Sequence, residues 1–549
     1  MTSRPGDDFD TLVALVPAPK HARAATVAAV GTRIDDWWLR LLSTSGRQRA
    51  WAWGGPIFVT VLAAVLRLWG LGHPGTLVFD ETYYVKDAWS QHTLGYEGSW
   101  GPGVDGKFAA GHTNIFTSVP SFVAHPPLGK WFIGLGMAIF GPANPFGWRI
   151  AVATAGILAV LLLTLIATHL LRSTLLGVLA GFFMAIDGNA IVMSRVSLLD
   201  NFVMFFCLLG FGAILLDRGQ SARRLDRWVA RRNATGRDLA WGPMLWFRPW
   251  LFAAGGLFGV ASAVKWNGVY FLVVFIIYSL VVDAVARRKA GVEFWATGTI
   301  FRQGLASVVL TVPIAVVMYL VGWTGWFVTK GGYDREWIQT GGGTAWKGAL
   351  GWVPDIIQNF WHYEAAVYAF NDTLATPHPY QAYPPLWLLL QRPTSMFYEG
   401  TAHGVAGCTA QSCGEAILGL ANPLIWYAAV AACLYLFYRL IRHREWRYGL
   451  ILTGIVAGYF PWFLYLHRTV FQFYTIAFEP YLILGLVATL GHILGKRTDA
   501  TIRRLSGIRL VAVMVVMSVL ITAFFWPMWT AERVPWFYIE LHYWLASWR

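Results

Sequence analysis

Long apolar runs separated by short polar segments dominate the chain from residue 51 onwards. A bilayer core about 30 Å thick requires roughly 20 apolar residues per helix, and about eleven runs approach that length. The pattern therefore predicts an all-α polytopic membrane protein with about eleven transmembrane helices. The predicted spans are 56–72, 147–171, 175–193, 198–216, 250–266, 268–286, 305–323, 416–438, 449–466, 473–494 and 510–528.

The apolar run from Trp131 to Phe140 is excluded from this count because it is too short to cross a bilayer and is rich in glycine. We expect it to lie as a helix in the outer membrane interface. Counting it as a span would place segment 217–249, which is rich in arginine, outside the cell. The preference of Lys and Arg for cytoplasmic loops argues against that arrangement.

The resulting topology describes a protein of the cell (plasma) membrane whose chain has three parts. Residues 1–50 form a cytoplasmic N-terminal segment, residues 51–528 form the transmembrane domain, and residues 529–549 form an extracytoplasmic tail. Two extracytoplasmic loops are long, and we expect them to contain loop helices and the functional site. These loops are 73–146 and 324–415.

Charge and cysteine content add two constraints. The net charge is +14, but the basic residues lie mostly in short loops where they orient the chain, so nucleic-acid binding is not expected. Cys207 and Cys433 fall in predicted spans and are expected to be core residues. Cys408 and Cys413 lie five residues apart in an external loop and are expected to form a disulfide if that compartment is oxidising. No metal site is predicted from these cysteines.

Two adjacent carboxylates, Asp80 and Glu81, follow the first span in a chain that has few acids. Ionisable groups at a membrane edge usually have a function. The alternative is that Asp80 is only a helix cap. Five cations also lie near the outer membrane face, where they would bind a lipid phosphate or extend separately to lipid headgroups. They are Arg67, Arg149, Arg195, Lys265 and Arg468.

Five segments in order resemble the signatures of the protein O-mannosyltransferase family, most closely its shorter, actinobacterial-type members. They include Phe79-Asp80-Glu81 and, further along, His125-Pro126-Pro127-Leu128-Gly129-Lys130, Trp148-Arg149, Ser194-Arg195-Val196-Ser197-Leu198-Leu199-Asp200 and Val264-Lys265-Trp266-Asn267-Gly268. The resemblance extends from about residue 50 to 530 and implies a GT-C glycosyltransferase architecture. Eukaryotic relatives carry a β-trefoil (MIR) domain in an external loop, and residues 324–415 are too few to hold one.

The resemblance implies transfer of mannose from polyprenyl-phosphate mannose to Ser or Thr hydroxyls of proteins outside the membrane. Asp80 is expected to be the base for an inverting reaction, because an alcohol is a poor nucleophile until its proton is accepted. Glu81 points away from Asp80 and is expected to orient hydroxyl groups. Four cations are candidates for binding the donor phosphate, which needs no general acid to leave. They are Arg149, Lys265, Arg67 and Arg195.

Two further residues are weaker candidates. His125 is followed by Pro126 and Pro127, which fix the chain beside it in the external loop. Asp200 is expected to pair with Arg195 and position it. The sequence indicates no required cofactor and does not decide whether a divalent metal is needed. Expected partners are the lipid-linked donor, secreted acceptor proteins and membrane lipids, with the secretion translocon a further candidate.

Two other functions fit part of the pattern. A lipid-linked glycosyltransferase that acts on a lipid or glycan would share the architecture, the carboxylate and the phosphate-binding cations. A transporter is disfavoured because it would show an internal repeat and polar residues near the membrane midplane, whereas here the charges gather at the outer face.

Overall fold

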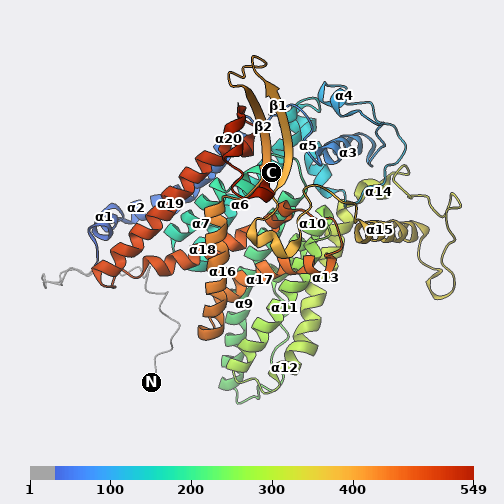
Figure 1. Ribbon diagram of the computed structural model, residues 1–549. Coiled ribbons are helices and arrows are strands. Elements are labelled where there is room, and N and C mark those ends of the chain that lie inside the picture. The colour runs from blue at the N-terminus through green and yellow to red at the C-terminus, as the bar shows by residue number, and fades with distance from the viewer. Residues whose placement is uncertain (1–30) are drawn as a thin grey trace.

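The computed structural model describes residues 31–549, in which a bundle of long helices carries smaller elements at one end (Figure 1). Eight helical segments are long and apolar enough to cross a membrane. They contain α2 (Ser45–Leu68), α6 (Pro145–Leu171), α9 (Asp200–Ala234), α11 (Gly268–Lys289), α12 (Trp295–Thr297) with α13 (Gly304–Gly322), α16 (Pro423–His443), α17 (Trp446–Tyr459) and α19 (Thr501–Thr530).

Four apolar helices in the described chain are shorter: α5 (Leu128–Phe140), α7 (Thr174–Ile186), α10 (Pro249–Val264) and α18 (Glu479–Leu494). Three of them lie on predicted spans, and α5 lies on the run that was excluded as too short. The helical membrane architecture is confirmed. The count of eleven spans stays a prediction, because length and composition alone support eight.

The boundaries of these helices follow ordinary capping chemistry. Asn144 accepts from the Phe146 N–H and is followed by proline, so α6 begins there. Asn422 caps α16 in the same way and is also followed by proline. Both helices end at an arginine in the left-handed conformation, Arg172 and Arg444.

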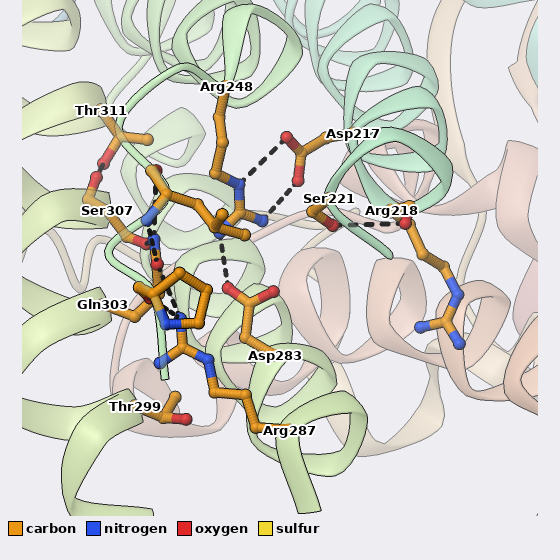
Figure 2. Close-up of polar contacts among 12 residues, drawn as sticks. Asp217, Arg218, Ser221, Arg248, Asp283, Arg287, Thr299, Gln303, Ser307 and Thr311 are labelled. Carbon is orange, nitrogen blue, oxygen red and sulfur yellow. Dashed lines mark hydrogen bonds and ion pairs between the residues drawn. The ribbon is translucent and has the colours of Figure 1, made fainter. Parts of the chain in front are cut away.

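Two ion pairs join α9 and α10, which pack side by side in antiparallel directions. Lys265, just after α10, donates to both oxygens of Asp200 at the start of α9. Arg248, just before α10, binds Asp217 further along α9 (Figure 2). The pairs therefore fix the register of the two helices at both ends of α10.

The first long loop contains helices α3 (Glu81–Leu94) and α4 (Asp105–Ala109), followed by α5. The second contains α14 (Thr324–Val328) and α15 (Asp355–Thr373) and ends in a hairpin of β1 (Thr394–Ala402) and β2 (Ser412–Gly419). Cys408 and Cys413 form a disulfide in this hairpin. The hairpin projects from the end of the bundle at which α3 and α4 lie (Figure 1).

The hairpin corrects two expectations. The fold is mostly helical but includes a three-stranded sheet, completed by β3 (Val534–Pro535), that the sequence analysis did not predict. The expected span 416–438 begins instead with the end of β2, and α16 starts only at Pro423. The first residues of the predicted span therefore form a buried apolar strand, not the start of a membrane helix.

The two ends of the chain also contain ordered structure. The expected cytoplasmic segment includes α1 (Arg33–Leu41), capped by Thr32, while residues 1–30 lie outside the described part. The expected tail, 529–549, contains α20 (Trp536–Glu540) and packs against the rest of the protein through buried Trp548, whose indole donates to the Leu390 carbonyl. One further short helix, α8 (Gly188–Met193), links α7 to α9.

Candidate active site

Asp80 is presented by a backbone turn between α2 and α3. The residue before it, Phe79, has a φ of +51°, which is uncommon for a bulky side chain and costs about 1–3 kcal/mol. Its ring packs edge-on against His378, Phe471 and Phe473, at centroid separations of 6.0, 5.5 and 5.7 Å. These contacts stabilise the turn, and elements distant in sequence therefore hold Asp80 in place.

The Asp80 carboxylate is half-buried, and within residues 31–549 it has no hydrogen bond or ion pair. It occupies the N-cap position of α3, but its side chain makes no capping hydrogen bond, so the structure does not support the alternative that Asp80 is only a helix cap. Burial raises the pKa of Asp80 to about 6, opposed by the charge of Lys265 and reinforced by that of Asp200. A carboxylate with these properties suits a general base near neutral pH.

Lys265 and Asp200 form a buried pair beside Asp80. The Lys265 ammonium donates to the two Asp200 oxygens at 2.9 and 3.0 Å and lies 4.1 Å from the ring centroid of Tyr474. The expected pairing of Asp200 with Arg195 is therefore wrong. Two of the three ammonium donors of Lys265 are directed at Asp200, which leaves one for another acceptor.

His125 lies in the same region, with its ring 6.1 Å from that of Tyr84. Burial lowers the pKa of His125 well below its usual value, and the charges of Lys265 and Arg468 lower it further. The imidazole is therefore neutral at neutral pH. Its backbone carbonyl accepts a 3.5 Å hydrogen bond from Lys130, which is itself paired with Glu97.

Glu81 has a different environment from Asp80. Its side chain is fully buried and accepts four hydrogen bonds: two from the Arg149 guanidinium at 2.8 and 2.7 Å, one from the Ser197 N–H at 2.8 Å and one from the Val78 N–H at 2.9 Å. The expected contact of Glu81 with hydroxyl groups finds no support here, because both oxygens are already occupied. Glu81 instead ties the start of α3 to α6.

Arg149 uses all five of its N–H donors inside the protein. Besides Glu81, it donates to the carbonyls of Leu71, Pro74 and Thr76, and it is 1% exposed. No donor is left for a phosphate in this arrangement. Arg149 therefore positions the loop that precedes Asp80, and we do not retain it as a phosphate ligand.

Arg67 and Arg195 are also engaged internally. Arg67 is fully buried and donates to Ser194 and to the carbonyls of Met184 and Ala185. Arg195 donates to four carbonyls at the end of α2, where it satisfies groups that a helix terminus leaves unpaired. The hydrogen bonds of Arg67 and Arg195 therefore do not support their expected role in binding the donor phosphate.

Arg468 is the fifth cation near the outer membrane face, and the sequence did not assign it a role. One of its terminal nitrogens donates to Asn371 at 2.8 Å, whereas its buried Nε has no partner within the described chain. Its charge acts on both His125 and Lys265. Arg468 also lines a cavity of about 380 Å³ together with Arg392 and His467. The sequence signal for it was only its position before a predicted span, since its partners lie far away in the chain.

Asp80, Lys265, Asp200, His125 and Arg468 thus come together, while Glu81, Arg149, Arg67 and Arg195 support the surrounding backbone. Tyr84 and Tyr474, which the sequence analysis did not single out, complete the site. Among residues 31–549 no group of three or more His, Cys, Asp and Glu side chains is placed to hold a metal ion.

Two family models match the sequence. The model described as "dolichyl-phosphate-mannose-protein mannosyltransferase" matches residues 57–324, and that of the "C-terminal four TMM region of protein-O-mannosyltransferase" matches 356–548. The polyprenol-phosphate-mannose–protein mannosyltransferase of Mycobacterium tuberculosis is 34% identical over 511 residues, covering 92% of both chains. The Corynebacterium glutamicum enzyme of the same name is 30% identical, covering 89% of this chain and 92% of its own.

Two further comparisons cover very different shares of this chain. The structure of the Saccharomyces cerevisiae protein O-mannosyltransferase Pmt1-Pmt2 complex bound to the sugar donor superposes with a TM-score of 0.67 over 97% of each chain, at 14% identity, and so shows the same fold. A lipid-linked arabinosyl transferase of Pseudomonas aeruginosa is 35% identical, but only over 23% of this chain.

Proposed function

Because the chain belongs to the protein O-mannosyltransferase family, we propose that it transfers mannose from polyprenyl-phosphate mannose to Ser or Thr hydroxyls of proteins. The observation that carries this proposal is the Asp80 carboxylate, which has no partner among residues 31–549 and lies beside the Lys265–Asp200 pair. We place the reaction at the extracytoplasmic face of the cell membrane, with residues 1–50 in the cytoplasm, on the basis of the loop charges.

Asp80 accepts the proton of the acceptor hydroxyl as the oxygen attacks the anomeric carbon of mannose. The bond from that carbon to the phosphate oxygen breaks on the opposite side, so the configuration inverts. Glu81 is buried and occupied, so a second carboxylate does not face the reacting bond from this position. This separation of the two acids supports a single displacement.

The leaving polyprenyl phosphate already carries charge and needs cations rather than a proton. Lys265 has an ammonium donor to spare, and Arg468 has a buried N–H without a partner in the described structure. We assign the phosphate to these two side chains in place of Arg149, Arg67 and Arg195. Asp200 holds Lys265 in position and His125, which is neutral, lies beside them without adding a positive charge.

The decisive experiment uses the full-length protein in liposomes with labelled polyprenyl-phosphate mannose and a Ser/Thr-rich peptide that contains proline. Label is expected in the peptide, and Asp80→Asn should abolish its appearance. Label that enters a lipid or glycan acceptor and never the peptide would contradict the proposal and favour the alternative transferase.

Association with the secretion translocon is a separate proposal, since that machinery would deliver unfolded acceptor chains to this face.

A further inference from the structure

A second cavity, of about 1430 Å³, lies far from the candidate active site. Helix α9 begins at Asp200, beside Asp80, and reaches Arg218 in the cavity wall about 27 Å further along its axis. The other walls come from α11, from the turn between α6 and α7, and from the end of α16 with the start of α17. The cavity therefore belongs to the opposite end of the bundle and takes no part in the proposed transfer.

Apolar side chains form one side of this cavity, including Leu215, Val281, Val285 and Leu440. Val281 and Val285 are 56% and 47% exposed on α11, a helix long and apolar enough to cross a membrane. The apolar wall therefore continues from the cavity onto the surface that faces lipid. A ligand with a hydrocarbon portion can enter from the membrane without crossing a polar barrier.

The rest of the lining is strongly basic. It contains eight Lys and Arg side chains and a single carboxylate, Asp283. That carboxylate is bound by Arg248, which also binds Asp217 (Figure 2). Arg287 is fixed by Gln303 and by two backbone carbonyls. An anion in the cavity therefore meets no uncompensated negative charge.

Three of the lining cations have no side-chain partner in the described part of the chain. Arg223, Lys289 and Arg444 come from three separate segments, and within residues 31–549 their side chains make no hydrogen bond, ion pair or ring contact. Arg218 stands 4.2 Å above the Trp446 ring at the same cavity. Unpaired like charges repel one another across a shared space, so this arrangement favours binding of a counter-anion.

We propose that this cavity binds one anionic phospholipid, with the phosphate headgroup among Arg223, Lys289 and Arg444 and the acyl chains along Val281 and Val285. The cavity exceeds the roughly 300–1,000 Å³ of ordinary small-molecule sites and is open to the membrane, which fits a lipid better than a soluble anion. Basic pockets between transmembrane helices are suited to anionic lipid headgroups. The basic end of the bundle places this lipid in the leaflet opposite the active site.

The test uses the full-length protein, purified in detergent and stripped of lipid, with binding followed by native mass spectrometry. Phosphatidylglycerol is expected to bind at one copy per chain, and phosphatidylcholine is not. The triple variant Arg223→Gln, Lys289→Gln, Arg444→Gln should bind phosphatidylglycerol about 100-fold more weakly, since each cation near a lipid surface contributes about a factor of five. The matched control is Arg231→Gln, Arg237→Gln, Arg302→Gln, which removes three exposed charges that do not line the cavity.

Equal weakening in both triple variants would show a general charge effect and overturn the proposal. Polyprenyl-phosphate binding that is lost in the cavity triple variant but kept in the control variant would also overturn it, because the cavity would then hold the donor carrier. If a variant fails to fold, titration of the unchanged protein with phosphatidylglycerol and phosphatidylcholine still tests the preference for an anionic headgroup. Tight binding of phosphatidylcholine by the unchanged protein would leave the cations without a role and equally contradict the proposal.

Discussion

Asp80 and Glu81 are adjacent in the chain, yet their carboxylates lie in opposite environments. Asp80 is half-buried and unpaired within the described chain, whereas Glu81 is fully buried and accepts four hydrogen bonds. The turn at Phe79 and the first turn of α3 direct the two side chains apart. One acid is therefore available for chemistry, and the other holds the helix that presents it.

Asp80→Asn should lower the transfer rate by about 10²–10⁴-fold, because the shape is kept and proton acceptance is lost. Donor affinity should persist, since the phosphate is held by other side chains. Transfer to peptide and donor binding are measured on the same preparation. Asp355→Asn, an exposed aspartate in the second loop, serves as the control and should leave both unchanged. Near-normal turnover of Asp80→Asn would remove it as the base.

The pH profile of transfer should show one acidic limb with a midpoint near pH 6. Asp80 acts only when ionised, and burial raises its pKa to about 6, so the rate falls as the pH drops through that value. An ordinary aspartate would keep its activity to about pH 4. Values of kcat/KM for the donor, measured from pH 4.5 to 8, provide the check, because they report the pKa of the free protein. A rate that is constant down to pH 5 would contradict the raised pKa.

Removing the charge of Lys265 and removing that of Asp200 should shift the midpoint of the acidic limb of the pH profile in opposite directions. The Lys265 charge lowers the pKa of Asp80, so Lys265→Met should shift the acidic limb to higher pH. The Asp200 charge raises the same pKa, so Asp200→Asn should shift the limb to lower pH. Both profiles are compared with that of the unchanged protein. Shifts of the same sign in both variants would show that the effect is general disruption of the site.

Loss of Arg149 should weaken the fold more than it weakens donor binding. Arg149→Ala removes the partner of a buried carboxylate, which typically costs about 3–5 kcal/mol of stability. Arg149→Lys should recover only part, because an ammonium lacks the five donors of the guanidinium. Thermal unfolding is measured beside donor affinity per folded molecule. A variant with normal stability but weak donor binding would instead place the phosphate on Arg149.

Sidedness is tested with single cysteines introduced at exposed positions. Ala345→Cys in the second long loop should react with an impermeant thiol reagent in intact cells, whereas Ala222→Cys on α9 should react only after the membrane is opened. Cys433→Ser lowers the background, since Cys207 is buried and the other two cysteines form a disulfide. Reaction at position 222 in sealed cells would reverse the proposed orientation.

Asp80 was accessible to sequence reasoning because acids are rare in this chain and two of them follow a membrane span directly. The roles of Arg149 and Lys265 were not accessible in the same way. Their partners, Glu81 and Asp200, are 68 and 65 residues away, and a cation near the membrane surface looks the same in sequence whether it binds a phosphate or a carboxylate. Only the folded arrangement shows which donors are already used.

The helices were largely predictable because their apolar runs are long. The hairpin was not, since the apolar stretch of β2 is short and continues nearly into α16. A short apolar run is compatible with a buried strand or with part of a helix, and periodicity does not separate the two. The same ambiguity affects α7, α10 and α18, whose lengths fall below that of an ordinary membrane span.

The two ion pairs along α9 define a length as well as a register. Asp200 and Asp217 are separated by about 25 Å along the helix axis, which is less than the roughly 30 Å of an average hydrocarbon core. The four charged side chains of these pairs are nonetheless buried, at most 5% exposed, so their charges are neutralised inside the protein and do not have to reach the lipid headgroups. Removing one member of either pair would leave its partner as an uncompensated charge within the bundle, so the two pairs make the assembly of α9 with α10 depend on all four residues.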